Sequence, residues 1–205
     1  MVNGLTIQEP WRVSLFIFSI VWLVIPGCVP AKLSGYAPHG SGTLERRYCA
    51  GPGVADVLRV DAGSGVRVDI RAGQNHRNGT ITLDIRLTVP EKVVVQLLSS
   101  EIVLESMEWP KPRVLPIDRI LGSGPKPGPN SYAPTDKLSG SAVSPGLFSL
   151  WFLKGEKGTT FQTGIPKESF FTMALPSLSI NGKVFHFDRL SFEAYEKLSF
   201  YTCVQ

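Results

Sequence analysis

Apolar and polar residues alternate one by one along two neighbouring stretches of this chain, 66–72 and 80–89. The apolar positions are even-numbered in the first stretch and odd-numbered in the second. Because successive side chains of a β-strand point to opposite faces, this alternation is typical of antiparallel strands with one buried and one solvated face. Helical periodicity is almost missing elsewhere in the sequence. We therefore expect an all-β protein.

Charges on the polar faces of these two strands predict how the strands pair. If both apolar sets face one core, the numbers of paired residues add up to an odd total. A total of 155 sets Arg71 opposite Asp84 and Asp69 opposite Arg86, whereas 153 sets like charges opposite each other. Like charges in direct opposition destabilise a sheet. We predict the register with the total of 155, which leaves residues 76–79 as the loop.

Further strands are predicted along the rest of the chain, at 54–60, 92–98, 102–107, 146–152, 159–163 and 169–174. Asn181-Gly182 separates two alternating segments and predicts a two-residue type I′ turn, which sets Leu178 opposite Phe185. The tail from Leu190 fits a strand, although 193–198 could also form a helical turn.

Residues 110–146 hold eight of the sixteen prolines. Proline removes a hydrogen-bond donor that a central strand needs, so we expect a long, irregular Pro- and Gly-rich loop there. Such a loop is either functional or an insertion without consequence. The strands are short and this connection interrupts them, which favours a single antiparallel β-sandwich over 43–205, Ig-like or jelly-roll-like, rather than a barrel.

An apolar run lies near the N-terminus, at 13–25, with Pro26-Gly27 after it. A membrane-spanning helix needs about 20 apolar residues, whereas a shorter run ended by helix breakers is typical of a secretory signal. The residues Ile25-Pro26-Gly27-Cys28 resemble the lipobox of bacterial lipoprotein precursors. The resemblance implies that residues 1–27 are removed and that Cys28 carries the lipid that anchors the protein in a membrane. Without lipidation, the run would be an ordinary secretory signal or an uncleaved anchor.

The residues after the lipobox refine this expectation. Within the lipoprotein resemblance, Val29 stands where an Asp would retain the protein in the inner membrane. The resemblance therefore implies a cell-envelope location, with the outer membrane preferred over the inner one. Residues 28–42 are rich in Gly, Pro and Ser and show no periodicity. We expect them to form a flexible tether between lipid and domain.

The three cysteines are expected to have two roles, one as the site of the lipid anchor and two as a disulfide pair. Once Cys28 is assigned to the lipid, Cys49 and Cys203 remain as an even pair in an oxidising compartment, which predicts a disulfide. The alternative is two buried free thiols. No Cys or His lies within two to five residues of another, so we expect no metal site.

No sequence motif for nucleophilic, phosphate or metal chemistry is present, and the net charge of +4 is too dilute for a nucleic-acid partner. We therefore predict no catalytic residue and no cofactor. Trp109 and Trp151 are candidate stacking platforms for a sugar or peptide, although large aromatic residues in a small β domain more often belong to the core. His186 lies two residues before Asp188, which could orient its imidazole, but a surface histidine is the simpler interpretation.

These observations predict a membrane-anchored cell-envelope lipoprotein with a non-catalytic binding or structural role, whose partner could be another envelope protein. The alternative is a carbohydrate-binding or hydrolytic envelope lipoprotein with a cleft near Trp109, Trp151 and His186. A pocket in which buried carboxylates converge would favour the alternative, and a fully solvated His186 would weaken it.

Overall fold

The computed structural model describes residues 30–46, 55–75, 79–123, 130–140, 144–152 and 162–200. Every regular element of these residues is a β-strand, and all strand pairs are antiparallel. The prediction of an all-β antiparallel fold is confirmed. No helix in the described ranges has the length and apolar character needed to cross a membrane.

Twelve strands form one large sheet and four form a small one. The large sheet contains β1 (Pro30–His39), β2 (Thr43–Glu45), β3 (Val57–Gly63), β4 (Val66–Asn75), β5 (Thr80–Val89), β7 (Glu101–Glu105), β8 (Arg113–Ser123), β9 (Asn130–Tyr132), β11 (Gly146–Phe152), β12 (Gln162–Pro166), β13 (Phe170–Ala174) and β16 (Leu190–Phe200). The small sheet contains β10 (Leu138–Ser139), β6 (Val94–Leu97), β14 (Leu178–Ile180) and β15 (Lys183–Phe185).

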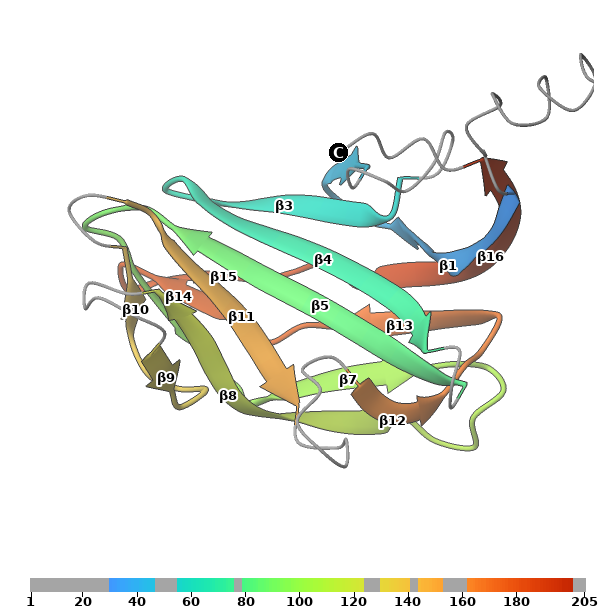
Figure 1. Cartoon of the computed structure of the whole chain (residues 1–205). Helices are drawn as coiled ribbons and strands as arrows, with labels where there is room; N and C mark the ends of the chain where they lie inside the picture. The colour runs from blue at the N-terminus through green and yellow to red at the C-terminus, as the bar shows by residue number, and fades with distance from the viewer. Residues whose placement is uncertain are drawn as a thin grey trace, which may run out of the picture.

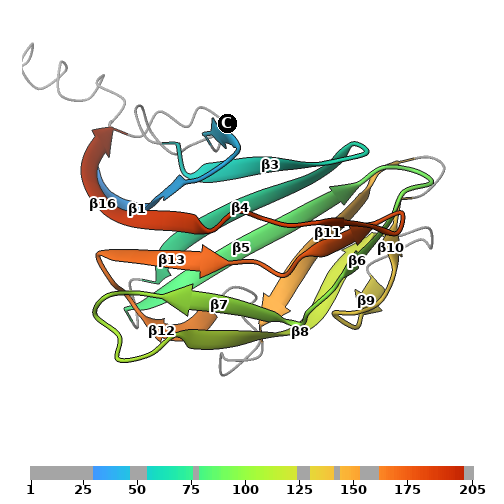
Figure 2. The ribbon, with the colours of Figure 1, turned by 180° about the vertical axis from the view of Figure 1, so that it is seen from behind.

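The large sheet folds over itself into two packed layers (Figures 1 and 2). One layer runs β1-β16-β13-β7 and the other β11-β5-β4-β3-β2. β8 joins the two layers, because its residues up to Pro116 pair with β7 and those from Ile117 pair with β11. The inward side chains of both layers form one core, in which the Phe171 ring stacks on Phe192 and meets Tyr36 edge-on. The architecture is thus a sandwich that approaches a closed barrel.

The predicted register of β4 and β5 is confirmed. Arg71 pairs with Asp84, and Asp69 pairs with Arg86. The last pair joins Asn75 to Thr80, so residues 76–79 lie between the paired strands. The apolar residues of both strands face the core, and the charged residues face outward.

The predicted hairpin near the C-terminus is confirmed as well. Leu178 pairs with Phe185, and the turn residues Asn181 and Gly182 have φ angles of 49° and 83°. Those positive values are what a type I′ turn requires of both central residues. β5 and β11 have the predicted bounds, the ends of the other predicted strands are shifted by up to three residues, and the tail from Leu190 is a strand.

The prediction of a flexible tether at 28–42 is wrong from residue 30 onward, because β1 pairs with β16 over ten residues, from Pro30 with Phe200 to His39 with Ser191. Residues 28 and 29 lie outside the described residues. The composition that suggested a tether has a local explanation. Gly35 lies opposite Tyr195, whose hydroxyl oxygen would be only 2.9 Å from a β-carbon at position 35. A small residue lets the tyrosine ring cover the strand, and Tyr36 next to it is fully buried in the core. The folded part therefore begins by residue 30.

The prediction that 110–146 is an irregular loop is also wrong for its described part, which contains β8, β9 and β10, whereas residues 124–129 and 141–143 lie outside the described residues. Although proline has no amide hydrogen to donate, Pro116 does not interrupt the sheet. The amide nitrogen of Ile117 donates to the Ser100 carbonyl on the β7 side, so the preceding Pro116 nitrogen faces away from β7. Pairing with β11 on that other side begins only at Ile117. Pro116 therefore removes no donor that the sheet uses.

Candidate functional site

A groove of about 350 Å³ lies at one end of the sandwich. Four segments distant in sequence line it: the end of β4, the turn after β7, the connection between β12 and β13, and the middle of β16. Their lining residues are Gln74, Glu108, Lys167, Glu168, Ser169, Ala194, Tyr195 and Glu196, and we call this the carboxylate groove. Its volume lies at the lower end of the range found for small-molecule sites.

Glu168 is fixed from the core side through its backbone. The Tyr36 hydroxyl donates a hydrogen bond of 2.9 Å to the Glu168 carbonyl, and the Glu168 amide donates to the same hydroxyl at 3.2 Å. Tyr36 is itself fully buried, and burial raises the pKa of its hydroxyl. The hydroxyl therefore stays protonated and holds the backbone of Glu168 in place.

The side chain of Glu168 is positioned by Trp109. The indole nitrogen of Trp109 donates a hydrogen bond of 2.6 Å to Oε1 of Glu168. Trp109 is half-buried and packs against the core. Its backbone belongs to a turn in which Ser106 accepts hydrogen bonds from the amides of Glu108 and Trp109. The turn thus places both Glu108 and Trp109 at the groove.

Glu108 and Glu168 both line the groove, and a hydrogen bond between their side chains acts on the pKa of Glu168. This bond is the main reason that the pKa of Glu168 lies above its ordinary value, and burial adds to the shift. The hydrogen bond from Trp109 opposes it by stabilising the carboxylate. The Ser169 hydroxyl donates to Oε1 of Glu108 at 3.1 Å and completes the cluster. Hydrogen bonds from Trp109 and Ser169 thus fix oxygen atoms of both carboxyl groups in the groove.

This arrangement limits the chemistry that the pair can perform. Glycoside hydrolysis uses two carboxyl groups about 5–5.5 Å apart with retention, or about 6.5–9.5 Å apart with inversion. Trp109 and Ser169 instead each fix one oxygen atom of these carboxyl groups, and the remaining oxygen atoms can accept hydrogen bonds. Accepting hydrogen bonds from a ligand is the chemistry that this geometry fits best.

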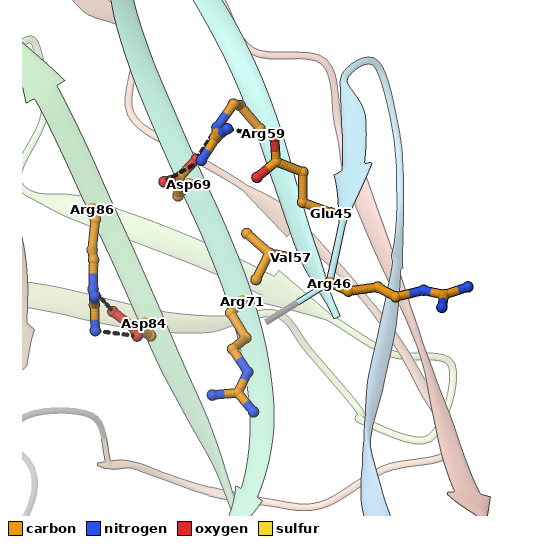
Figure 3. Close-up of a pocket in the computed structure, with 8 residues that line it drawn as sticks. All are labelled: Glu45, Arg46, Val57, Arg59, Asp69, Arg71, Asp84 and Arg86. Carbon is orange, nitrogen blue, oxygen red and sulfur yellow. Dashed lines mark hydrogen bonds and ion pairs between the residues drawn. The ribbon is translucent and has the colours of Figure 1, made fainter. Parts of the chain in front are cut away.

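A second cluster of charges lies on the outer face of β2, β3, β4 and β5, around a hollow of about 150 Å³ (Figure 3). Arg59 donates to both oxygens of Asp69, at 2.7 and 3.2 Å, and also to Glu45. Arg86 donates to both oxygens of Asp84 at 2.9 Å.

One further ion pair extends beneath this face, where Nε of Arg71 lies 2.8 Å from Oδ2 of the buried Asp56. Figure 3 shows Arg46 pointing away from these pairs. Three arginines of the outer face are thus neutralised by carboxylates of the same chain. These ion pairs stabilise the sheet and leave little net charge for a ligand.

The structure does not gather the three predicted ligand residues into one cleft. Trp109 contacts the carboxylate groove, whereas Trp151 lies on the outer face with the Arg119 guanidinium 5.7 Å from its ring centre. His186 is exposed, with Nδ1 2.8 Å from Oγ of Ser177. Asp188 accepts a hydrogen bond from Ser41 at 2.5 Å instead of orienting His186. Neither Trp151 nor His186 lines the carboxylate groove or the hollow of the outer face.

The remaining predicted site residues are the cysteines. Cys28, Cys49 and Cys203 lie outside the described residues. Within the described ranges, no three His, Cys, Asp or Glu side chains are grouped so that they could hold a metal ion.

Sequence reasoning missed Glu108 and Glu168, which are sixty residues apart. The only local hint was an acidic residue beside a tryptophan directly after a predicted strand. Its carboxylate partner follows from the topology alone, because β7 and β13 are neighbours in the sheet. Comparison of the chain with protein-family models, with curated proteins and with solved structures finds no match.

Proposed function

We propose that this protein is a lipid-anchored cell-envelope protein that binds a ligand in the carboxylate groove and catalyses no reaction. The observation that carries the proposal is the pair of glutamates that line the groove, Glu108 and Glu168, which are held in place by hydrogen bonds from Ser169, Trp109 and Tyr36. Side chains fixed in this way lose little conformational entropy when they bind a ligand, which favours affinity.

The chemistry of the groove indicates the class of ligand. Three of its lining residues are glutamates, and Lys167 is the one cation among those residues. Carboxylate and amide oxygens accept hydrogen bonds, so the groove favours a ligand rich in donors. Carbohydrate hydroxyls and protonated amines both meet this requirement, and amines would add an ionic attraction.

Direct titration tests this part of the proposal. Calorimetry with a soluble oligosaccharide and with a linear diamine distinguishes the two ligand chemistries. Glu168→Gln should weaken binding of the ligand that responds by about tenfold, which corresponds to about 1.4 kcal/mol. Glu101→Gln, which changes an exposed glutamate at the start of β7, should leave binding unchanged. Equal affinity of both variants would contradict a binding role of the groove.

The location rests on Cys28. Lipid attached to its thiol would anchor the protein, since two or three acyl chains hold a protein durably in a bilayer. The absence of an Asp after Cys28 supports the outer membrane as the destination. Cys28→Ala should shift the protein from the detergent phase to the aqueous phase in phase partitioning. Unchanged partitioning of that variant would refute the lipid anchor, whatever the groove binds.

A second candidate function is glycoside hydrolysis, because two carboxyl groups do converge beside a tryptophan. It requires the two carboxyl groups to stand on either side of the scissile bond, about 5–5.5 Å apart for retention or about 6.5–9.5 Å apart for inversion. Release of a chromophore from aryl glycosides, abolished by Glu168→Gln, would favour this candidate over binding alone.

A further inference from the structure

The strand registers bring the first strand and the turn after β7 to the same end of the sandwich. At the start of β13, Phe170 pairs with Glu193 of β16. β16 runs on past that point to Phe200, which pairs with Pro30 at the start of β1. Because β7 is antiparallel to β13, the turn at 106–112 leaves the sheet at this end as well. Figures 1 and 2 show these segments on one side of the molecule, which we call the β1 end.

The covalent distance from Cys28 to the β1 end is short. Pro30 follows Cys28 by two positions, and two positions span at most about 7 Å even when the chain is fully extended. A lipid on Cys28 would therefore hold the β1 end beside the bilayer, because β1 starts only two positions after Cys28.

Large apolar side chains are exposed at this end. Met107 in the turn is 99% exposed, Phe170 is 41% exposed, and Val114 near the start of β8 is 54% exposed. Burying an apolar side chain of this size is worth roughly 1.5–3 kcal/mol. In water the exposed parts of these three side chains gain nothing from their position, whereas at a lipid surface those parts would be buried.

The polar residues around them suit the boundary between water and lipid. Trp109 stands in the same turn, and tryptophan is enriched at the level of the headgroups. Lys111 and Arg113 follow it and are exposed, so that their cationic groups could reach lipid phosphates while their stems stay near the acyl region. The turn itself holds one acidic and one basic residue, Glu108 and Lys111, and is not repelled by an anionic surface.

We infer that the β1 end is a membrane-contacting surface, with Met107 and Phe170 inserted at the headgroup boundary and Lys111 beside the phosphates. This inference rests on the proposed lipid anchor at Cys28. It selects the lipid surface over a protein partner because the short connection to Cys28 would keep this end at the bilayer at all times. The carboxylate groove, which the same segments line, would then open beside the membrane.

Photocrosslinking of the full-length, lipidated protein tests the inference. The protein is reconstituted in vesicles of phosphatidylethanolamine and phosphatidylglycerol, with benzoylphenylalanine in place of Met107. The matched control carries the same probe in place of Leu147, which is 60% exposed. Leu147 pairs with Thr88 near the far end of β5, away from the β1 end. We expect lipid adducts from position 107 and none above background from position 147.

The possible results test the membrane contact of the β1 end and the lipid anchor at Cys28 separately. If Cys28→Ala stays in the membrane fraction, the lipid anchor is refuted. If the protein is anchored but position 107 yields no more lipid adduct than position 147, the membrane contact is refuted while the anchor stands. If position 107 instead forms adducts with a second copy of the chain, the membrane contact is also refuted, and the β1 end is a surface for self-association.

Discussion

The indole nitrogen of Trp109 and the carboxylate of Glu168 are joined by a hydrogen bond of 2.6 Å, although they belong to different strand connections. This bond ties the turn after β7 to the entry of β13 and sets the position of one carboxyl group of the groove. The bond also stabilises the ionised form of Glu168, whereas the neighbouring Glu108 favours the protonated form of Glu168. The stability of the fold and the protonation of the groove are therefore coupled at Trp109.

Trp109→Phe should keep the aromatic packing and remove the donor. We expect the free energy of unfolding to fall by about 1 kcal/mol, below the usual value for a hydrogen bond to a charged group because Glu168 is partly solvated. The pKa of Glu168 should rise further, since the lost bond opposed the shift. Urea unfolding and a carbon-detected NMR titration measure the two effects. Trp151→Phe is the matched control, because it keeps a ring beside Arg119 and should change neither quantity appreciably.

Stability should decrease as the pH rises through the folded-state pKa of Glu168. The ordinary pKa of its carboxyl is 4.5 and the folded value lies above it, so the folded state binds more protons between these two values. The contribution of this group to stability is complete below about pH 4.5 and is lost as the pH rises past the folded value. Glu108→Gln removes the main cause of the shift and should reduce this loss.

Urea midpoints measured between about pH 4 and neutrality test that expectation. Glu101→Gln also removes one acidic charge of β7 and its turn but leaves the groove intact, and it should retain the dependence of the wild type. The same pH dependence in Glu108→Gln as in the wild type would mean that the pair is not coupled.

Asp56→Asn should destabilise the fold more than Asp69→Asn does, although both carboxylates pair with an arginine. Asp56 is 2% exposed, and its loss leaves Arg71 without its buried counter-ion. Arg71 is 35% exposed and can recruit water, so we expect a loss of about 2 kcal/mol rather than the 3–5 kcal/mol of a fully buried pair. Asp69 lies nearer the solvent, and Arg59 keeps Glu45, which predicts about 0.5 kcal/mol. Equal losses in chemical denaturation would be inconsistent with this account.

Two substitutions at Asn181 should separate backbone strain from hydrogen bonding. Asn181→Gly preserves the positive φ and loses only the bond from the Val94 amide to Oδ1, at a cost of about 1 kcal/mol. Asn181→Ala loses the same bond and adds about 1 kcal/mol for a left-handed conformation. Thermal unfolding of the two variants should therefore differ, with the alanine variant melting first. A lower melting temperature for the glycine variant would argue against strain at this turn.

Features that depend on neighbouring residues could be predicted from the sequence. The register of β4 and β5 followed from the charges of Asp69, Arg71, Asp84 and Arg86, because a two-residue slip sets like charges opposite each other. The type I′ turn followed from Asn181-Gly182, where both residues tolerate positive φ. Such features involve few residues and short loops, so local chemistry determines them.

Features that depend on distant partners could not be predicted. β1 has the composition of a linker. The reason for its glycine, Gly35, is the ring of Tyr195, which lies 160 positions away in the sequence. Pro116 is compatible with β8 only because the strand changes partner at that point. The carboxylate groove could not be predicted for the same reason, because Glu108 and Glu168 are brought together by the pairing of β7 with β13. No local pattern contains that information.

The pairing of β1 with β16 also determines how a mechanical load would enter the domain. A pull on Cys28 would act on Pro30, and thus on the outermost pair of the ladder, Pro30 with Phe200. A pull directed across the ladder, away from β16, separates the pairs one after another from Pro30 inward, so each step needs less force than shearing all ten at once. Tension would peel β1 away and then withdraw the buried Tyr36 from the core and from the backbone of Glu168. The groove would lose its shape under tension before the rest of the sheet opened.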